Sequence, residues 1–93
     1  MIDQILYERN PAPGKLDVLG VDEWPIWEKE PSEFPWTYTR SEDCYILEGH
    51  FIITPENGEA MEFIRGDLIS FPKGMSCTWK ILEAVTKNYR FGD

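Results

Sequence analysis

The sequence contains one histidine and two cysteines in 93 residues, and it has no long apolar run. No stretch approaches the roughly 20 apolar residues that a membrane-spanning helix needs, so we expect no such helix. The first residues, MIDQILYERNPAPG, have neither a basic beginning nor an uninterrupted apolar stretch. We therefore expect a cytoplasmic protein whose two thiols stay reduced rather than forming a disulfide.

Basic residues are also scarce. Nine Lys and Arg stand against 17 Asp and Glu, which gives a formal charge of -8 at pH 7. Binding to nucleic acid depends on clustered Lys and Arg that neutralise phosphates. The composition therefore excludes nucleic acid and anionic membranes as expected partners.

Large apolar side chains are abundant instead. Hydrophobic residues make up 42% of the chain, including four Trp, four Tyr and five Phe. A chain of this length forms one small domain with a single core, and these rings are large enough to fill it. We expect residues 1–93 to form one domain with an aromatic core.

Five of the prolines lie in the first forty residues and exclude long helices and central strands there: Pro11, Pro13, Pro25, Pro31 and Pro35. From Trp36 onward, short β-rich runs alternate with turn signals, which is typical of an all-β sandwich or barrel. The pattern predicts an N-terminal arm over residues 1–19, a barrel over about 20–91, and no helix longer than about two turns.

Two local features of the barrel can be predicted. The runs CYILEG and HFIIT meet at Gly49, which indicates a bend or bulge in one long strand. Asn57-Gly58 suits the left-handed dihedrals of a tight hairpin between HFIIT and AMEFI. The run AVTKNYRF mixes polar and apolar residues on one face, so we expect an edge strand or a partner surface there.

Two other runs show the alternation of a half-buried strand. In GDLISFP, Asp67, Ile69 and Phe71 share one face. In SCTWKI, Cys77 and Trp79 share a face that we expect to point into the barrel.

Motif spacing then suggests a family. Glu42 is followed by Gly49 in EDCYILEG, and Gly66, Pro72 and Gly74 recur in GDLISFPKG. With these residues in place, the chain resembles the cupin superfamily, and within it the cupin domain of ureidoglycine aminohydrolase, over about residues 20–91. The resemblance implies a small double-stranded β-helix, or jelly-roll barrel, and dimerisation.

The same resemblance implies where a metal would bind. Cupin metals are usually held by imidazoles and one carboxylate, and a stable site needs three or four protein ligands. The family's two histidines align with Trp36 and Tyr38, or with Pro35 and Thr37, and Cys77 takes the third histidine's place. Only Glu42 and Cys77 remain as donors, so we expect neither a bound metal nor another cofactor.

These replacements predict an aromatic pocket in place of the metal centre. Its candidate ligand-binding residues are Trp36, Tyr38, Glu42, Cys77 and Trp79. Such a pocket suits a small apolar or cationic ligand, although the same rings could instead simply fill the barrel. A carboxylate at Glu42 inside the barrel must be hydrogen-bonded, neutralised or engaged by a ligand, and an ordinary partner such as a tyrosine hydroxyl or Arg40 explains it at least equally well. A buried Cys77 is expected to act as a small hydrophobic residue.

Three hypotheses of function follow. The first is a small-molecule-binding or non-catalytic cupin that has lost its metal site. The second is a metal-dependent enzyme that acts on a ureide or a similar small nitrogenous acid, as the resemblance implies. The third is an interaction module that forms a homodimer through the aromatic segment WPIWEKEPSEFPW, residues 24–36, because aromatic residues are enriched at interfaces.

Overall fold

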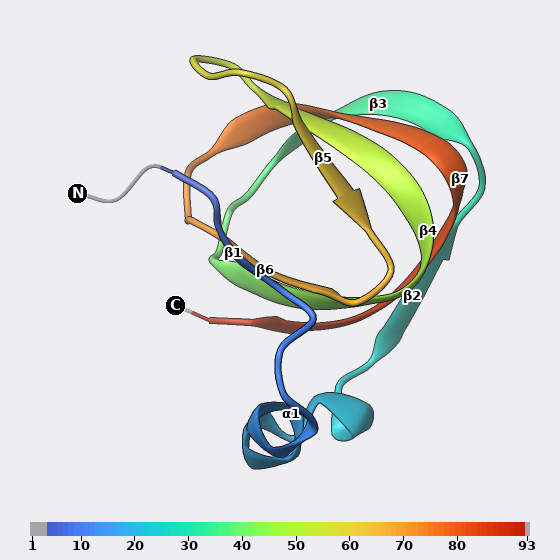
Figure 1. The fold of residues 1–93 in the computed structure, drawn as a ribbon. Coiled ribbons are helices and arrows are strands. Elements are labelled where there is room, and N and C mark those ends of the chain that lie inside the picture. The colour runs from blue at the N-terminus through green and yellow to red at the C-terminus, as the bar shows by residue number, and fades with distance from the viewer. Residues whose placement is uncertain (1–3, 93) are drawn as a thin grey trace.

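The protein is a β-barrel built around two long strands. The computed structural model describes residues 4–92. Its elements, in chain order, are β1 (Leu6–Arg9), α1 (Pro13–Leu19), the 3-10 helix η1 (Val21–Glu23), β2 (Ile26–Lys29), β3 (Ser32–Thr37), β4 (Glu42–Pro55), β5 (Met61–Ile64), β6 (Asp67–Phe71) and β7 (Ser76–Phe91). Figure 1 shows the strands curving round a common interior, with the helices outside it.

The long strands β4 and β7 pair with each other along most of their length, antiparallel, from Glu42 opposite Phe91 to Pro55 opposite Cys77. On the far side of β4, β6 pairs with its first half and β5 with its second. On the far side of β7, β3 pairs with its first half and β2 with its second. The result is a double-sheet jelly roll in which β4 and β7 belong to both sheets, as the sequence predicts.

The predicted bend at Gly49 is confirmed as an irregularity in β4. The β4–β7 register shifts between Ile46 and Phe51. Before the shift the buried positions are even-numbered, as at Cys44, and after it they are odd-numbered, as at Ile53. Because side chains alternate along a strand, extra residues at the bulge are what keep both halves of β4 facing the core.

A β-carbon at Gly49 has no room. Its φ is 114°, and an added Cβ would lie 2.5 Å from the carbonyl oxygen of Ala84. The close approach of β7 therefore requires glycine at this bend. Two other glycines of the cupin-like motifs, Gly66 and Gly74, also have positive φ.

The hairpin between β4 and β5 is confirmed, but its predicted turn is wrong. Neither Asn57 nor Gly58 has a positive φ. The Gly58 amide instead donates a hydrogen bond to the Pro55 carbonyl at 3.2 Å, which closes an ordinary turn. The last β4–β5 pair is Ile53 opposite Met61. A loop this long does not need the left-handed residues of a two-residue hairpin.

The expected edge strand AVTKNYRF is also wrong, because it forms the second half of β7, with partners on both sides. β2 lies along one side and β4 along the other. Its polar character comes from buried, bonded side chains. Asn88, for example, donates to the carbonyl of Trp24 at 3.1 Å.

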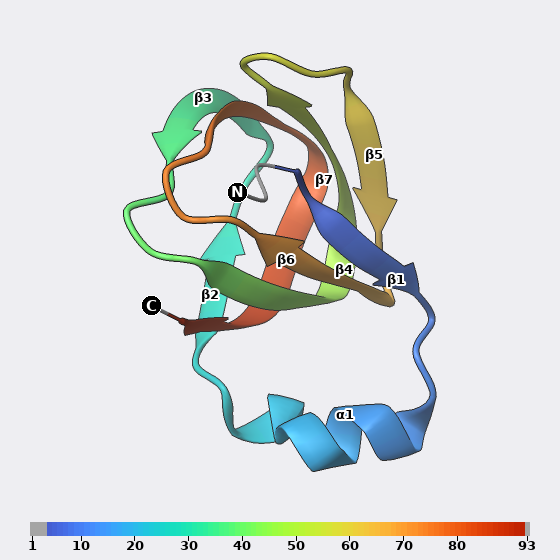
Figure 2. The same cartoon turned by 90° about the vertical axis from the view of Figure 1, so that its left-hand side faces the viewer.

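The N-terminal segment contributes a strand and the helical connection. β1 pairs with β6 at the margin of the barrel. α1 begins with Pro13 and ends at Leu19, and the next residue, Gly20, adopts the left-handed conformation common after a helix. It has no buried residue. Figure 2 shows α1 outside the barrel, between β1 and β2.

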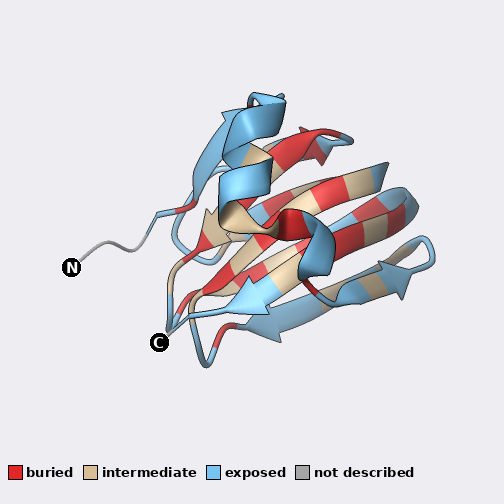
Figure 3. Cartoon of the chain, turned by 90° about the horizontal axis from the view of Figure 1, so that it is seen from below, coloured by how far each residue is buried: buried red, intermediate tan, exposed pale blue. Residues whose placement is uncertain are grey.

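The core occupies the interior of the barrel. Figure 3 shows buried and less buried residues alternating along the strands. The expected inner face of β7 is confirmed, because Cys77, Trp79 and Ile81 are all buried. Asp67, Ile69 and Phe71 of β6 are buried on one face, as their alternation predicts. Within residues 4–92, no helix is long and apolar enough to cross a membrane.

Candidate functional site

A cavity of about 180 Å³ opens between the sheets, and its walls are largely aromatic. The residues that line it are Trp27, Phe34, Trp36, Tyr38, Glu42, Trp79, Lys87, Tyr89 and Phe91. They come from β2, β3, β4 and β7 and from the residue after β3. Only two of them, Glu42 and Lys87, are ionisable at neutral pH.

Trp79 organises the aromatic wall. Its ring stacks on Phe51, with centroids 4.6 Å apart and planes 11° apart, and it lies nearly parallel to Phe34 at 6.1 Å. Trp27 meets it edge-on at 5.9 Å. The Trp79 indole N–H donates to the Tyr38 hydroxyl at 3.2 Å. Because Trp79 is held by several rings and a hydrogen bond, this wall is preformed.

Tyr38 and Trp36 contribute in different ways. Tyr38 is buried and stacks on Phe71, with centroids 4.6 Å apart. Burial, together with the nearby Cys44, Glu42 and Cys77, raises its pKa, so the hydroxyl is neutral across the physiological range. Trp36 is 49% exposed, which places it at the mouth of the cavity.

The polar part of the cavity is a buried ion pair. The Lys87 ammonium donates to Glu42 Oε2 at 2.7 Å, and both side chains are almost fully buried. Lys87 also contacts Cys44 Sγ at 3.5 Å, and the Cys44 thiol donates to the same Glu42 oxygen at 2.9 Å. These contacts join three side chains from β4 and β7 in one network.

Aromatic faces complete the surroundings of the Lys87 ammonium. The Nζ atom lies 4.7 Å from the ring centroid of Trp27 and 4.8 Å from that of Trp79. Both distances fall within the range of cation–π attraction. In the β-sheet register Lys87 stands opposite Ile46, so its long side chain reaches back along β4 past Cys44 to Glu42.

The network shifts the pKa of two of its members. Burial by itself disfavours the charged form of Lys87, but Cys44 and Glu42 outweigh this effect and raise the pKa of the ammonium. Burial also raises the pKa of the Cys44 thiol, and the positive charge of Lys87 only partly opposes it. At neutral pH the site therefore contains an ammonium ion and a neutral thiol.

Four of the five predicted site residues line this cavity together: Trp36, Tyr38, Glu42 and Trp79. Cys77 is buried beside them in β7 but does not line the cavity. Burial raises the pKa of Cys77 to about 11. The thiol is therefore protonated and a poor nucleophile at neutral pH.

Neither predicted partner of Glu42, a tyrosine hydroxyl or Arg40, bonds to it within residues 4–92, where its side-chain partners are Lys87 and Cys44. Arg40 instead donates to the Gly92 carbonyl at 3.1 Å and lies over the Phe91 ring. Lys87 takes this role instead. Its alternation with Val85 and Tyr89 places it on the inward face of β7, and a lysine on an inward face requires a carboxylate partner. This alternation is the feature of the sequence from which Lys87 could be predicted as the partner of Glu42.

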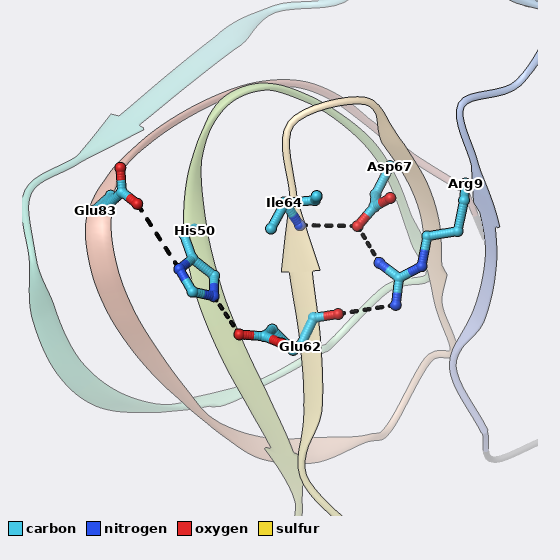
Figure 4. Close-up of polar contacts among 6 residues, drawn as sticks. All are labelled: Arg9, His50, Glu62, Ile64, Asp67 and Glu83. Atoms are coloured by element: carbon cyan, nitrogen blue, oxygen red, sulfur yellow. Dashed lines mark hydrogen bonds and ion pairs between the residues drawn. The ribbon is translucent and has the colours of Figure 1, made fainter.

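A second polar cluster lies on β4, β5 and β7, away from the cavity (Figure 4). His50 contacts the Glu62 carboxylate through Nε2, and its Nδ1 is 3.8 Å from Glu83. Both carboxylates are largely exposed. Exposed pairs of this kind contribute little to stability.

The neighbouring contacts in Figure 4 are structural. The buried Asp67 accepts a hydrogen bond from the Ile64 amide at 2.8 Å and pairs with Arg9. Arg9 also donates to the Glu62 carbonyl at 3.0 Å. These bonds tie β1 to the turn between β5 and β6.

Comparison with known proteins assigns this barrel to a family. The family model of the EutQ-like cupin domain matches residues 16–89. The chain belongs to the EutQ-like cupin family. No curated protein matches this cupin.

Solved structures agree with the family assignment. A DUF861 family protein from Thermotoga maritima is 49% identical to this cupin, with a TM-score of 0.92 over 96% of this chain and 100% of that one. A proposed ethanolamine utilization protein Q from Salmonella typhimurium is 30% identical, with a TM-score of 0.64, over 71% of this chain and 53% of that one. The EutQ protein of Clostridium difficile shares the fold, with 24% identity and a TM-score of 0.64 over 71% of this chain and 52% of that one. This cupin spans about half the length of both EutQ proteins.

The residues of this cupin do not fit the metal that its superfamily implies. Within residues 4–92, no group of three or more His, Cys, Asp or Glu side chains is placed to hold a metal ion. Glu42 Oε2 already accepts bonds from Lys87 and Cys44. An ammonium ion therefore lies beside the carboxylate that a metal would need.

Proposed function

We propose that this cupin binds a small molecule in the aromatic cavity and that its usual metal site has been lost. The observation that carries the proposal is the composition of the cavity: a preformed aromatic wall with one buried ion pair. Ligand sites are typically concave and mostly apolar, with a few polar groups that orient the ligand. The cavity of about 180 Å³ has this character.

The Glu42–Lys87 pair supports a role in binding rather than in stability. Removing two charges from water costs several kcal/mol per ion, and well-packed apolar residues often replace such pairs without loss of stability. Buried, charge-coupled groups that line a cleft are instead common at functional sites. The pair is thus better suited to recognising a ligand than to holding the barrel together.

The metal-dependent alternative, an enzyme acting on a ureide, is not favoured. It requires a ligand set that Trp36, Tyr38 and Cys77 do not supply. The family match indicates a cupin related to EutQ, and a fold alone does not confer an activity.

We further propose that the protein is a cytoplasmic homodimer, as the sequence suggests. Two tryptophans of the segment WPIWEKEPSEFPW are not available for a dimer interface, because Trp24 is buried and Trp27 lines the cavity. The exposed apolar residues of this region are Ile26 and Trp36. They are the side chains from which a dimer interface would be built.

The four tryptophans provide a direct test of ligand binding. Trp27, Trp36 and Trp79 line the cavity, whereas Trp24 does not and is covered by Arg90 at 4.6 Å. In a ¹⁵N-labelled sample, single-ring compounds should shift the three cavity indole N–H signals and leave the Trp24 signal in place. The proposal fails if no such compound moves the cavity signals, or if all four move alike.

A further inference from the structure

The Lys87 ammonium has bonding capacity that the protein does not use fully. An ammonium group has three N–H donors. Within residues 4–92, Lys87 Nζ has one oxygen acceptor, Glu42 Oε2 at 2.7 Å, and a long contact with Cys44 Sγ at 3.5 Å. The rings of Trp27, Trp79 and Tyr89 also surround Nζ, with centroids 4.7, 4.8 and 5.9 Å away.

The charge of the site is already balanced. Glu42 and Lys87 carry opposite charges and face each other, and the neighbouring Cys44 and Tyr38 are neutral. An anionic ligand would add an unpaired negative charge beside Glu42 in a chain of formal charge -8. A cationic ligand would approach the ammonium that already occupies the aromatic faces. A neutral ligand avoids both penalties.

The shape of the cavity limits the ligand to about one ring. A cavity of about 150 Å³ is large enough to admit benzene. The present cavity, of about 180 Å³, leaves room for one ring and a small substituent. The largely aromatic walls offer ring faces and edges, which favour a flat group.

We propose that the cavity takes a neutral, planar, single-ring molecule with a carbonyl-type acceptor, and that Lys87 donates a hydrogen bond to this acceptor. This inference rests on the proposed function and specifies two properties of its ligand, namely a neutral charge and a carbonyl-type acceptor. The raised pKa of Lys87 agrees with it, because a protonated amine donates and does not form an imine.

Three probes of nearly equal shape test the charge of the ligand: benzamide, benzoate and benzamidinium at neutral pH. We expect benzamide to bind about tenfold more tightly than either ion, measured by titration of the Trp27, Trp36 and Trp79 indole signals. If benzoate or benzamidinium binds as tightly as benzamide, the ligand class is wrong, whereas the proposed function survives. If none of the probes shifts these signals, the proposed function itself fails.

Toluene and a paired variant test the role of Lys87. Replacing both charges, Glu42→Gln with Lys87→Met, avoids an unpaired buried charge. We expect this variant to bind benzamide about tenfold more weakly than the wild type does, while toluene, which has no acceptor, binds both proteins equally. Unchanged benzamide binding would overturn the donor role. If the variant does not fold, the wild-type protein still tests the donor role of Lys87. Wild-type binding of toluene as tight as that of benzamide would overturn this role.

Discussion

Lys87 Nζ lies 2.7 Å from Glu42 Oε2, although the two residues are 45 positions apart in the sequence. The contact joins the start of β4 to the second half of β7 inside an aromatic wall. It places a positive charge beside the carboxylate that the resemblance to cupins makes a candidate metal ligand.

Removing one member of the Glu42–Lys87 pair should lower the free energy of unfolding more than replacing both members does. Lys87→Met leaves the buried Glu42 carboxylate without its cation, and we expect a loss of about 3–5 kcal/mol of unfolding free energy. The double variant Glu42→Gln/Lys87→Met should lose less than Lys87→Met alone. Urea unfolding of the wild type, both single variants and the double variant measures the coupling. Additive losses would show that the two side chains do not interact.

Gly49 should tolerate no side chain. Gly49→Ala would bring a Cβ to 2.5 Å from the Ala84 carbonyl oxygen at a positive φ, so we expect a loss of about 1–3 kcal/mol or more. Gly14→Ala is the matched control, because an added Cβ meets nothing within 4 Å and the residue lies in α1. We expect the control to gain about 0.5–1 kcal/mol. Equal thermal stabilities of the two variants would contradict the bulge at Gly49.

The buried thiol of Cys77 should make the free energy of unfolding fall as the pH rises into the alkaline range. Burial raises the pKa of its thiol from 9.0 to about 11 in the folded protein. A raised folded pKa contributes stability that is fully present below the unfolded pKa and is lost as pH rises through the folded value. Wild-type unfolding free energy should therefore fall between pH 9 and about 11, more steeply than that of Cys77→Ala. Parallel pH profiles for the two proteins would contradict this assignment.

Substitutions at Trp36 and Trp79 should have different effects, one mainly on ligand binding and the other mainly on stability. Trp79 is buried at the centre of the aromatic wall, so Trp79→Ala should cost about 3–5 kcal/mol of stability. Trp36 is 49% exposed at the mouth, so Trp36→Ala should cost far less while weakening benzamide binding. Chemical unfolding and ligand titration report the two effects. A large stability loss in Trp36→Ala would show that this ring is part of the core.

The proposed dimer depends on an apolar surface beside the cavity. Light scattering should give a mass of twice the 10.9 kDa chain. Ile26→Glu should shift this mass towards the monomer, because Ile26 is an exposed apolar residue of β2. Val18→Glu, on the exposed helix α1, is the control and should leave the mass unchanged. A wild-type mass of one chain would rule out the dimer.

Several features of the fold could be predicted because they depend on local backbone geometry. Gly49, Gly66 and Gly74 have positive φ, and sequence spacing identifies all three. The alternation at Cys77 and Trp79 predicts the inner face because successive side chains of a strand point to opposite sides. The dihedrals of the Asn57-Gly58 turn could not be predicted, because the length of the loop was not known.

The sequence by itself determined the barrel, its bend at Gly49 and the aromatic character of the interior, because these follow from steric limits and from a period of two. Only the tertiary structure decided that Lys87 is the partner of Glu42. That contact depends on the register between β4 and β7 and on the reach of a long side chain past Cys44. Register is a long-range property, and here it places the Lys87 ammonium beside Glu42 in a cavity with largely aromatic walls.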